Sequence, residues 1–394
     1  MTTCDDLPDN SPTPALSDAS MDSNEPLRQQ LLSFRGSTLK LPADCQVLTP
    51  EAVTRPALDR QTLLQTIQER VLENEAPDGI MESQRSCRLL LLLPDKTRRQ
   101  TAARLAVDAL IDLCEREDRF TLTIVFGLGT HPRMTPDDIT RILGSERQQR
   151  LIRLNVALHQ QTTLNPLPRR RIRIADPLAS KSNEMAIQMP EILWNCDLLL
   201  VAGDTDLHPY EGRAGSGGIH KMLAIGVGCL STIRMTHSLD ILTDPLTRPG
   251  EKGNRFVELV DYFAKEIINA LRTPRGPLIA APIGISTVAL RVDQPEAFWI
   301  GDREEERTCL MQPLKQERTV AMREAVDVVI ADTEEEKGTD LLAGARSLHF
   351  LCNFNKSNNP ILCKTSPWRT ALLFNGCHEM RNAHGIGNSG TVLH

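Results

Sequence analysis

The chain has 394 residues, which is long enough for two domains that each bury a full core. Charged residues make up 24% of the chain and the formal net charge is −6, a balance that argues against a nucleic-acid-binding surface. No apolar run reaches the roughly 18 residues that a membrane-spanning helix requires. We therefore expect a soluble protein with no nucleic-acid partner and no membrane partner.

The cysteines and the N-terminus indicate the compartment. Ten cysteines are scattered along the chain without any CxxC pair, so the sequence predicts no zinc knuckle. Cys87, Cys114, Cys229 and Cys352 lie inside apolar runs, a position typical of buried free thiols. The acidic N-terminus lacks the apolar core of a secretory signal. A reducing compartment is the simplest interpretation, and we expect the protein to be cytoplasmic.

The first ninety residues lead from a tail into a predicted helix. Residues 1–30 are rich in Ser, Pro, Thr and Asp and poor in large apolar side chains, which predicts a disordered tail. Short strands are expected from about Leu31 to Val53. Apolar residues at helical spacing predict a helix over residues 58–74.

A buried strand is predicted over residues 87–93, where five consecutive leucines are ended by a proline. The residues that follow are all polar: Asp95, Lys96, Thr97 and Arg98. A polar, basic cluster at the carboxyl end of a buried strand is where open α/β sheets place ligand sites. The two cations could bind a phosphate, and Asp95 and Thr97 a sugar or a ring substituent. The alternative is a helix N-cap with solvated basic neighbours, because residues 101–115 predict an amphipathic helix.

A second strand is predicted over residues 120–126, and it continues into a GLGT turn and a histidine, His131. Thr135 and Asp138, with Pro136 at the first helical position, predict a capped helix directly afterwards. His131 therefore lies in a loop between a strand and a helix. It lies at the same sheet edge as Asp95 if both strands are parallel.

The next stretch combines glycines with titratable side chains. Residues 171–176 predict a short strand, residues 185–197 a helix, and residues 198–201 a buried strand. Glycines at 212, 215, 217 and 218 then let the backbone approach a ligand closely. Four side chains that could do chemistry lie around them: His208, His220, Lys221 and His237. The sequence after the glycines predicts a short buried helix. Its lysine is either a phosphate contact or a nucleophilic amine, and the histidines are proton carriers or metal ligands; the alternative is a crossover with surface His and Lys.

The alternation of strand and helix through residues 87–230 predicts an α/β fold with a largely parallel sheet. We expect an N-terminal α/β domain over residues 31–250 and a C-terminal α/β domain over residues 251–394. The second domain is predicted to begin with a helix at residues 254–271. Strands are predicted after it, at residues 277–284, 286–292, 326–332 and 371–380.

Four segments in one order resemble a known family. They are DKTR at 95–98, GTHPRMT at 129–135, the HPY and GSGGIHKM segments with the later THS, and KG at 337–338. Together they resemble the nickel-pincer lactate racemase family, over roughly residues 88–350. The gaps match that family, with 36 residues from Asp95 to His131 and 16 from Lys221 to His237.

The resemblance implies a two-domain protein with its active site in the interdomain cleft. The implied cofactor is nickel pyridinium-3,5-bisthiocarboxylic acid mononucleotide, carried covalently on Lys221, with His237 as the protein ligand of the nickel. The loop that holds the mononucleotide would consist of Asp95, Lys96, Thr97 and Arg98. His131 and His208 match the paired acid/base histidines, and Lys337 matches a lysine that contacts substrate and cofactor.

The implied activity is that of an isomerase, a racemase or epimerase of a 2-hydroxy acid. One histidine takes the hydroxyl proton while hydride moves to the nickel-pincer cofactor, and hydride returned to the opposite face gives the epimer. Histidine suits these proton transfers because its ordinary pKa is near neutrality. The implied partners are the small-molecule 2-hydroxy acid and the enzymes that synthesise the cofactor.

Two departures indicate a sister group rather than lactate racemase itself. His208 lies 13 residues before Lys221, in a longer glycine segment than lactate racemases have. Glu334 occupies the position where lactate racemase has a carboxylate-binding Gln, and its charge would repel a substrate carboxylate. Lactate is therefore not the expected substrate. Two alternatives stay open: a catalytically degenerate binding protein of the same fold, and a zinc-dependent hydrolase using His131, His208 and His237.

Overall fold

The computed structural model describes residues 30–34, 37–41, 56–75, 86–179, 183–206, 208, 210, 218–247, 253–272, 278, 280–289, 293–318, 328–329 and 369–370. Contacts divide the chain into two units, residues 1–49 and residues 50–394. The first unit contains an antiparallel hairpin of β1 (Gln30–Phe34) and β2 (Ser37–Leu41), which confirms the short strands expected there. Apart from Gln30, the predicted tail lies outside the described residues.

The second unit is built on a six-stranded sheet in the order β10-β9-β8-β3-β4-β5. Its strands are β3 (Cys87–Pro94), β4 (Phe120–Gly129), β5 (Ala157–Thr162), β8 (Leu198–Ala202), β9 (Ile283–Val288) and β10 (Ala297–Gly301). All neighbouring pairs are parallel except β9 and β10, which are antiparallel. The predicted α/β class with a largely parallel sheet is confirmed.

The leucine run of β3 is buried on both faces, as its position between β8 and β4 requires. Leu89, Leu91 and Leu93 belong to one hydrophobic core, and Leu90 and Leu92 to the core on the opposite face. Alternate side chains of a strand point to opposite faces, so an unbroken apolar run needs helices on both sides of the sheet. Each fully buried leucine contributes about 1.5–3 kcal/mol relative to an exposed one.

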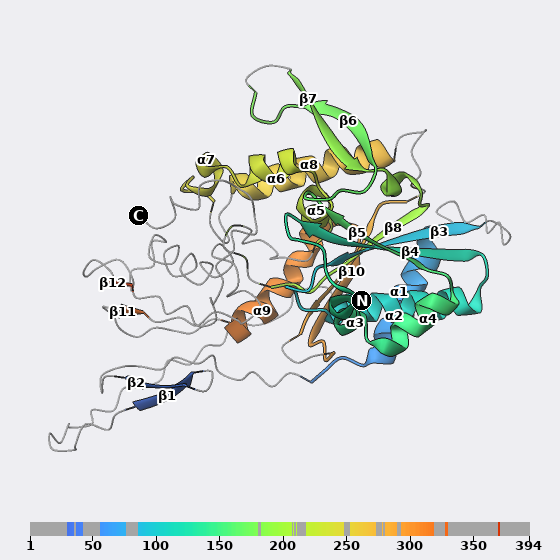
Figure 1. The fold of residues 1–394 in the computed structure, drawn as a ribbon, viewed down its shortest axis with the longest axis horizontal. Helices are drawn as coiled ribbons and strands as arrows, with labels where there is room; N and C mark the ends of the chain where they lie inside the picture. Colours follow the sequence, from blue (N-terminus) through green and yellow to red (C-terminus); the bar gives the residue numbers. More distant parts are fainter. Residues whose placement is uncertain are drawn as a thin grey trace, which may run out of the picture. The chain divides into compact units, whose positions relative to one another are not determined.

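Helices cover both faces of the sheet (Figure 1). One face packs against α1 (Arg60–Glu75), α2 (Thr101–Arg116), α3 (Pro136–Leu143) and α4 (Ser145–Arg153). The other packs against α5 (Ile219–Lys221), the π-helical turn η2 (Met222–Gly226), α6 (Leu230–Thr236), α7 (Leu239–Leu242), α8 (Arg255–Leu271), η3 (Glu304–Leu310) and α9 (Met311–Arg318). A further short parallel pair joins β11 (Val328–Val329) to β12 (Arg369–Thr370).

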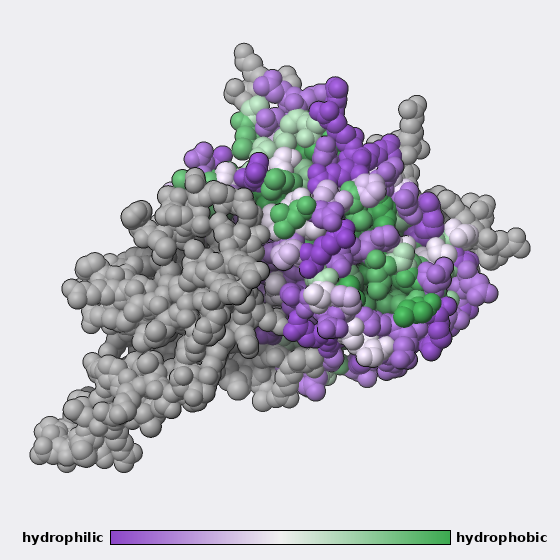
Figure 2. Space-filling view, viewed as in Figure 1, coloured by the Kyte–Doolittle hydropathy of each residue, from purple (hydrophilic) through white to green (hydrophobic). Residues whose placement is uncertain are grey.

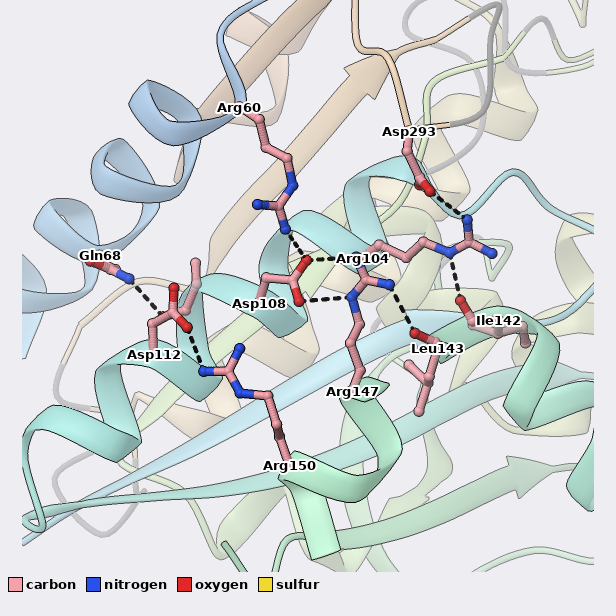
Figure 3. Close-up of polar contacts among 11 residues, drawn as sticks. Arg60, Gln68, Arg104, Asp108, Asp112, Ile142, Leu143, Arg147, Arg150 and Asp293 are labelled. Carbon is pink, nitrogen blue, oxygen red and sulfur yellow. Dashed lines mark hydrogen bonds and ion pairs between the residues drawn. The ribbon is translucent and has the colours of Figure 1, made fainter. Parts of the chain in front are cut away.

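An ion-pair network fastens the helices of the first face together (Figure 3). Arg147 of α4 donates two hydrogen bonds of 2.7 Å to the two carboxylate oxygens of Asp108 on α2. Arg60, at the start of α1, also pairs with Asp108. One turn along α2, Asp112 accepts a 2.6 Å bond from Arg150. The two-oxygen geometry at Asp108 makes this the strongest type of arginine–carboxylate contact, and it holds α1, α2 and α4 as one layer.

The predicted capping box of α3 is confirmed. Thr135 Oγ1 accepts the Asp138 N–H at 3.2 Å, and Asp138 Oδ2 accepts the Thr135 N–H at 3.0 Å, with Pro136 at the first helical position. Burial acts to raise the pKa of Asp138, but bonds from Lys96 and Thr135 outweigh it and hold the value at about 2. The box fixes the end of the loop that contains His131.

The helix predicted over residues 185–197 is wrong. The segment forms β7 (Glu184–Pro190), paired antiparallel with β6 (Arg169–Ala175), followed by the 3₁₀ turn η1 (Glu191–Trp194). Ile187 and Met189 point into the core while Gln188 between them is exposed, an alternation of period two that defines a strand. The predicted strand at residues 171–176 is confirmed as part of β6.

The sheet continues past residue 250, where the sequence predicted a domain boundary. β9 pairs with β8, so residues 283–301 complete the sheet that the first half of the chain begins. A single strand, β9, replaces the two predicted at 277–284 and 286–292, and β10 was not predicted. The helix predicted at 254–271 is confirmed as α8. Most of the remaining C-terminal segment, including residues 371–380, lies outside the described residues.

The visible surface of the described part is mostly hydrophilic, with apolar patches separated by polar side chains (Figure 2). Within the described residues, no helix combines the length and the apolar character needed to cross a membrane.

The N-terminus of helix α2 is capped by a side chain from a distant part of the chain, Asp204. Gln100 at its N-cap position makes no side-chain cap, and the Ala102 N–H instead donates to Asp204, just after β8, at 3.3 Å. Thr287 of β9 donates its hydroxyl to the same carboxylate. Burial raises the pKa of Asp204 to about 6, although these bonds and the charge of Arg99 act in the opposite direction. Asp204 therefore joins β8, β9 and α2 while its charged form is disfavoured.

Asp204→Asn should make the free energy of unfolding less dependent on pH. The folded-state pKa of about 6 lies above the ordinary value of 3.8 that holds in the unfolded chain. The stabilisation by protonated Asp204 is therefore present in full below the unfolded value and is lost as pH rises through about 6. The loss is at most roughly 3 kcal/mol, at about 1.4 kcal/mol per pKa unit. Urea denaturation of both proteins across this window measures it.

Asp138→Asn is the matched control with the opposite sign. The pKa of Asp138 is lowered to about 2, so its contribution is present above the unfolded value and is lost as pH falls toward 2. Equal pH responses of the two variants would contradict the role of burial at Asp204.

Candidate functional site

The predicted site residues follow the carboxyl ends of adjacent strands. β3 lies between β4 and β8 and is parallel to both, so the three strands end at one edge of the sheet. Asp95 comes directly after β3, His131 two residues after β4, and His208 six residues after β8. This edge is the position at which open parallel sheets place ligand sites.

Asp95 and His131 are in direct contact. The buried Asp95 carboxylate bonds to His131 Nδ1, and its other oxygen accepts the Thr97 N–H at 2.8 Å and the Thr97 hydroxyl at 2.5 Å. Burial acts to raise the pKa of Asp95. The bonds from His131 and Thr97 and the charge of Arg98 outweigh it and hold that pKa well below its ordinary value. An ionised carboxylate can only accept, so Nδ1 of His131 carries a proton and Nε2 of the neutral ring presents a lone pair.

The rest of the loop after β3 is partly engaged with the protein. Lys96 Nζ donates to Asp138 Oδ2 at 2.8 Å, which directs this cation toward α3. Gln100 Nε2 donates to the carbonyls of Asp95 and Arg98 at 2.7 and 2.8 Å. Gln100 Oε1 is buried and has no partner among the described residues. A buried acceptor without a donor is costly, so this oxygen is suited to a hydroxyl or N–H group of a bound ligand.

The end of β4 lies against the turn that follows Lys221. A Cβ added to Gly127 would lie 2.6 Å from Met222 Sδ and 2.9 Å from the carbonyl carbon of Gly226. Only glycine permits this approach. The half-buried Lys221 comes directly before Met222, so its helix is packed against the strand that leads to His131.

His208 and His237 both contact one aromatic ring and form a second group. The buried His208 stacks on Phe256 of α8 at 5.9 Å between ring centroids, and His237 meets the same ring edge-on at 5.2 Å. Tyr210 also packs on Phe256, and its carbonyl accepts a 2.7 Å bond from Asn254. Phe256 therefore fixes the placement of two histidines that are far apart in the sequence.

The hydrogen bonds assign the tautomers of this second group. The Tyr210 N–H donates to His208 Nδ1 at 3.3 Å, so neutral His208 carries its proton on Nε2. His237 Nδ1 lies 3.0 Å from both the Ile233 carbonyl and the Thr236 hydroxyl. The carbonyl can only accept and the hydroxyl donates its own proton to backbone carbonyls, so Nδ1 carries the proton and Nε2 the lone pair. A backbone carbonyl on the far nitrogen is the arrangement that metal-binding histidines use.

The structure thus brings the predicted residues together in two groups: Asp95 with Thr97 and His131, and His208 with His237. Lys221 lies beside the strand that leads to the first group. Lys337 and Glu334 lie outside the described residues. The sequence analysis missed Gln100 and Phe256. The position of Gln100 just after DKTR was a usable signal, whereas nothing in the sequence connects Phe256 to the histidines.

Among the residues that the structure describes, the zinc site of the alternative hypothesis is absent. The described residues, which include His131, His208 and His237, contain no group of three or more His, Cys, Asp or Glu side chains placed to hold a metal ion. A metal bound by one protein histidine and a cofactor needs no such group.

In the wild type, neutral His131 and His237 should carry the proton on Nδ1 and His208 on Nε2. Nitrogen-15 NMR of the ring nitrogens distinguishes the two tautomers. Asp95→Ala should shift only His131 toward the Nε2–H form, because it removes the acceptor at Nδ1. Asp112→Ala, which removes a carboxylate of α2 that pairs with Arg150 outside the site, is the control; a shift of His131 in both variants would contradict the assignment.

The comparisons with known proteins agree with the α/β fold. The family model for the lactate racemase N-terminal domain matches residues 34–250. A solved protein from Thermotoga maritima is similar with a TM-score of 0.55 at 16% identity, over 72% of this chain and 66% of that one, slightly less than two thirds of its length. The lactate racemase apoprotein from Thermoanaerobacterium thermosaccharolyticum is similar with a TM-score of 0.54 at 15% identity, over 79% and 69% of the two chains. No curated protein matches. The chain belongs to the lactate racemase family, through its N-terminal domain.

Proposed function

We propose that this protein is an isomerase that racemises or epimerises a 2-hydroxy acid with a nickel-pincer mononucleotide as cofactor. The observation that carries the proposal is the Asp95–His131 pair at the ends of two adjacent parallel strands, beside the helix of Lys221. An ionised carboxylate that holds a histidine in one tautomer is a general-base arrangement. The family membership supplies the reaction class.

The residues present fit the cofactor. Lys221 would carry it covalently, and His237 would bind its nickel through Nε2, the nitrogen left with a lone pair by the Ile233 bond. One imidazole from the protein, together with soft donors from the cofactor, would suit nickel. The loop of Asp95, Lys96, Thr97 and Arg98 would hold the mononucleotide, with Gln100 Oε1 as a further acceptor. When bound, the cofactor supplies the hydride acceptor.

The two histidines would handle the proton unequally. His131 takes the substrate hydroxyl proton on Nε2, and the ionised Asp95 stabilises the resulting cation. Neutral His208 presents an N–H from Nε2 and donates a hydrogen bond to the substrate oxygen. For His208 to act as the base, its Nδ1 must first release the Tyr210 amide. The resting enzyme therefore favours abstraction by His131, from one of the two epimers.

Three further expectations belong to this proposal. The C-terminal residues would form a second α/β domain and close an interdomain cleft over the site, with Lys337 contacting substrate and cofactor. The partners would be the 2-hydroxy acid and the cofactor-synthesis enzymes. The protein would work in the cytoplasm, and the buried free thiols of Cys114, Cys196 and Cys229 support a reducing compartment.

Co-expression with the pincer-cofactor synthesis enzymes should give wild-type protein with a covalent adduct and nickel. Lys221→Ala should lose both, because it removes the attachment point. His237→Ala should keep the adduct and lose most of the nickel, since even changes beyond the direct ligands cost about 10–100-fold in metal affinity. Intact-mass spectrometry measures the adduct, and metal analysis measures nickel.

His159→Ala is the matched control, because it removes a half-buried histidine from the edge strand β5, outside both groups. It should keep adduct and nickel in full. Wild-type protein that gains neither under these conditions would contradict the proposed function and favour a binding protein of the same fold.

Glu334→Gln should raise turnover of lactate and lower that of a longer polyhydroxy acid. Two carboxylates about 4 Å apart repel by roughly 1–4 kcal/mol, so an acidic residue beside the substrate carboxylate disfavours lactate. The same Glu can accept bonds from hydroxyl groups. Turnover of both substrates by cofactor-loaded wild type and variant tests this, and equal kinetics would show that Glu334 does not face the substrate.

A further inference from the structure

A buried ion pair lies next to the helix of Lys221. Glu304 and Arg307, both on η3, have side chains only 12% and 3% exposed. Arg307 Nε donates to Glu304 Oε1 at 2.7 Å, and a second guanidinium nitrogen lies 2.5 Å from the same oxygen. Buried charges are costly unless they are paired and hydrogen-bonded, so the other bonds of this pair matter.

Those bonds reach both sides of the glycine-rich stretch. Arg307 donates from its third nitrogen to Thr205 Oγ1 at 3.2 Å, and Glu304 Oε2 accepts the Ile219 N–H at 2.9 Å. Thr205 is three residues before His208, and Ile219 is two residues before Lys221. Thr205 is also fixed to the sheet, because its N–H donates to the Thr287 carbonyl of β9 at 2.8 Å.

Gly218 shows how closely the chain passes over the pair. A Cβ at this position would lie 1.9 Å from Glu304 Oε1 and 2.4 Å from an Arg307 nitrogen. Both atoms end flexible side chains, but each is buried and bonded to the other, so neither can move without breaking the pair. The glycine here serves the close approach of the backbone.

We propose that Glu304 and Arg307 are a positioning pair that holds the chain before His208 and the start of the Lys221 helix on one support. The inference rests on the proposed function, in which His208 handles the proton and Lys221 carries the cofactor. In this role neither member of the pair would touch substrate or cofactor. They act through Thr205 and Ile219, by keeping the histidine and the lysine in the relative placement that loading and proton transfer require.

The double variant Glu304→Leu/Arg307→Met separates this role from fold stabilisation. Replacing a buried ion pair with apolar side chains of similar volume often leaves stability unchanged or raises it. The variant therefore keeps the fold but loses the bonds to Thr205 and Ile219. The matched control is Asp108→Leu/Arg147→Met, which removes an ion pair between α2 and α4 (Figure 3) with side chains 8% and 21% exposed.

Hydrogen exchange of the apoprotein is the first readout. In the Glu304→Leu/Arg307→Met protein, the amides of residues 205–210 and 218–223 should exchange about tenfold faster or more, as expected when bonds to charged groups are lost. The amides of β3 and β4 should not change. The control variant should leave both stretches at the wild-type rate.

Loading of Lys221 after co-expression is the second readout. The positioning variant should carry the adduct at about a tenth of the wild-type level or less, and the control variant at the full level. Wild-type protein without an adduct would overturn the proposed function. Hydrogen exchange of the apoprotein would still show whether the pair holds residues 205–210 and 218–223 in place. A folded positioning variant with wild-type exchange and a full adduct would overturn the inference.

Arg307→Lys decides the case if the double variant does not fold. Lysine keeps the cation beside Glu304 but lacks the fork that reaches Thr205 at the same time. Faster exchange at residues 205–210 together with reduced loading supports the inference, and wild-type behaviour in both readouts overturns it.

Discussion

The parallel pairing of β3 with its two neighbours is the constraint on which the site depends. In a parallel ladder all strands end at the same edge, so the polar residues that follow each strand must meet there. The register places Pro94 of β3 opposite Gly127 of β4, and the chain after each strand then brings Asp95 and His131 into contact. Two residues 36 positions apart in the sequence are thereby joined by a hydrogen bond.

Close backbone packing connects this pair to the helix that contains Lys221. Gly127 admits Met222 and Gly226 at the end of β4, and Gly218 admits the buried carboxylate and guanidinium of η3. The lysine between these two contacts is thus held from both sides of its helix. Rigid support of this kind matters because misplacement of a reacting group by about 1 Å can cost two orders of magnitude in rate.

The hydrogen bonds give each histidine a defined chemical state. Nδ1 faces a carboxylate in His131, a backbone N–H in His208, and a carbonyl together with the Thr236 hydroxyl in His237. A carboxylate and a carbonyl leave a lone pair on Nε2, whereas the N–H leaves a proton there. The three side chains therefore differ in which ring nitrogen carries the proton, and under the proposed function they would serve as base, hydrogen-bond donor and metal ligand.

The sequence by itself determined the features that depend on local pattern. The leucine run predicted a central strand, Thr135 and Asp138 predicted a capped helix, and the DKTR and GTHPRMT segments identified the residues that lie at the ends of β3 and β4. For residues 185–197 the local pattern predicted a helix, because so short a run of apolar residues fits a helix as well as a strand. Pairing with β6, which the sequence does not show, makes the segment a strand. Only the tertiary structure decided that β9 and β10 join the sheet, that Phe256 contacts two histidines, and that Glu304 accepts a bond from the start of the Lys221 helix. These contacts join residues tens to a hundred positions apart, and pairings at such distances leave no periodic trace in the chain.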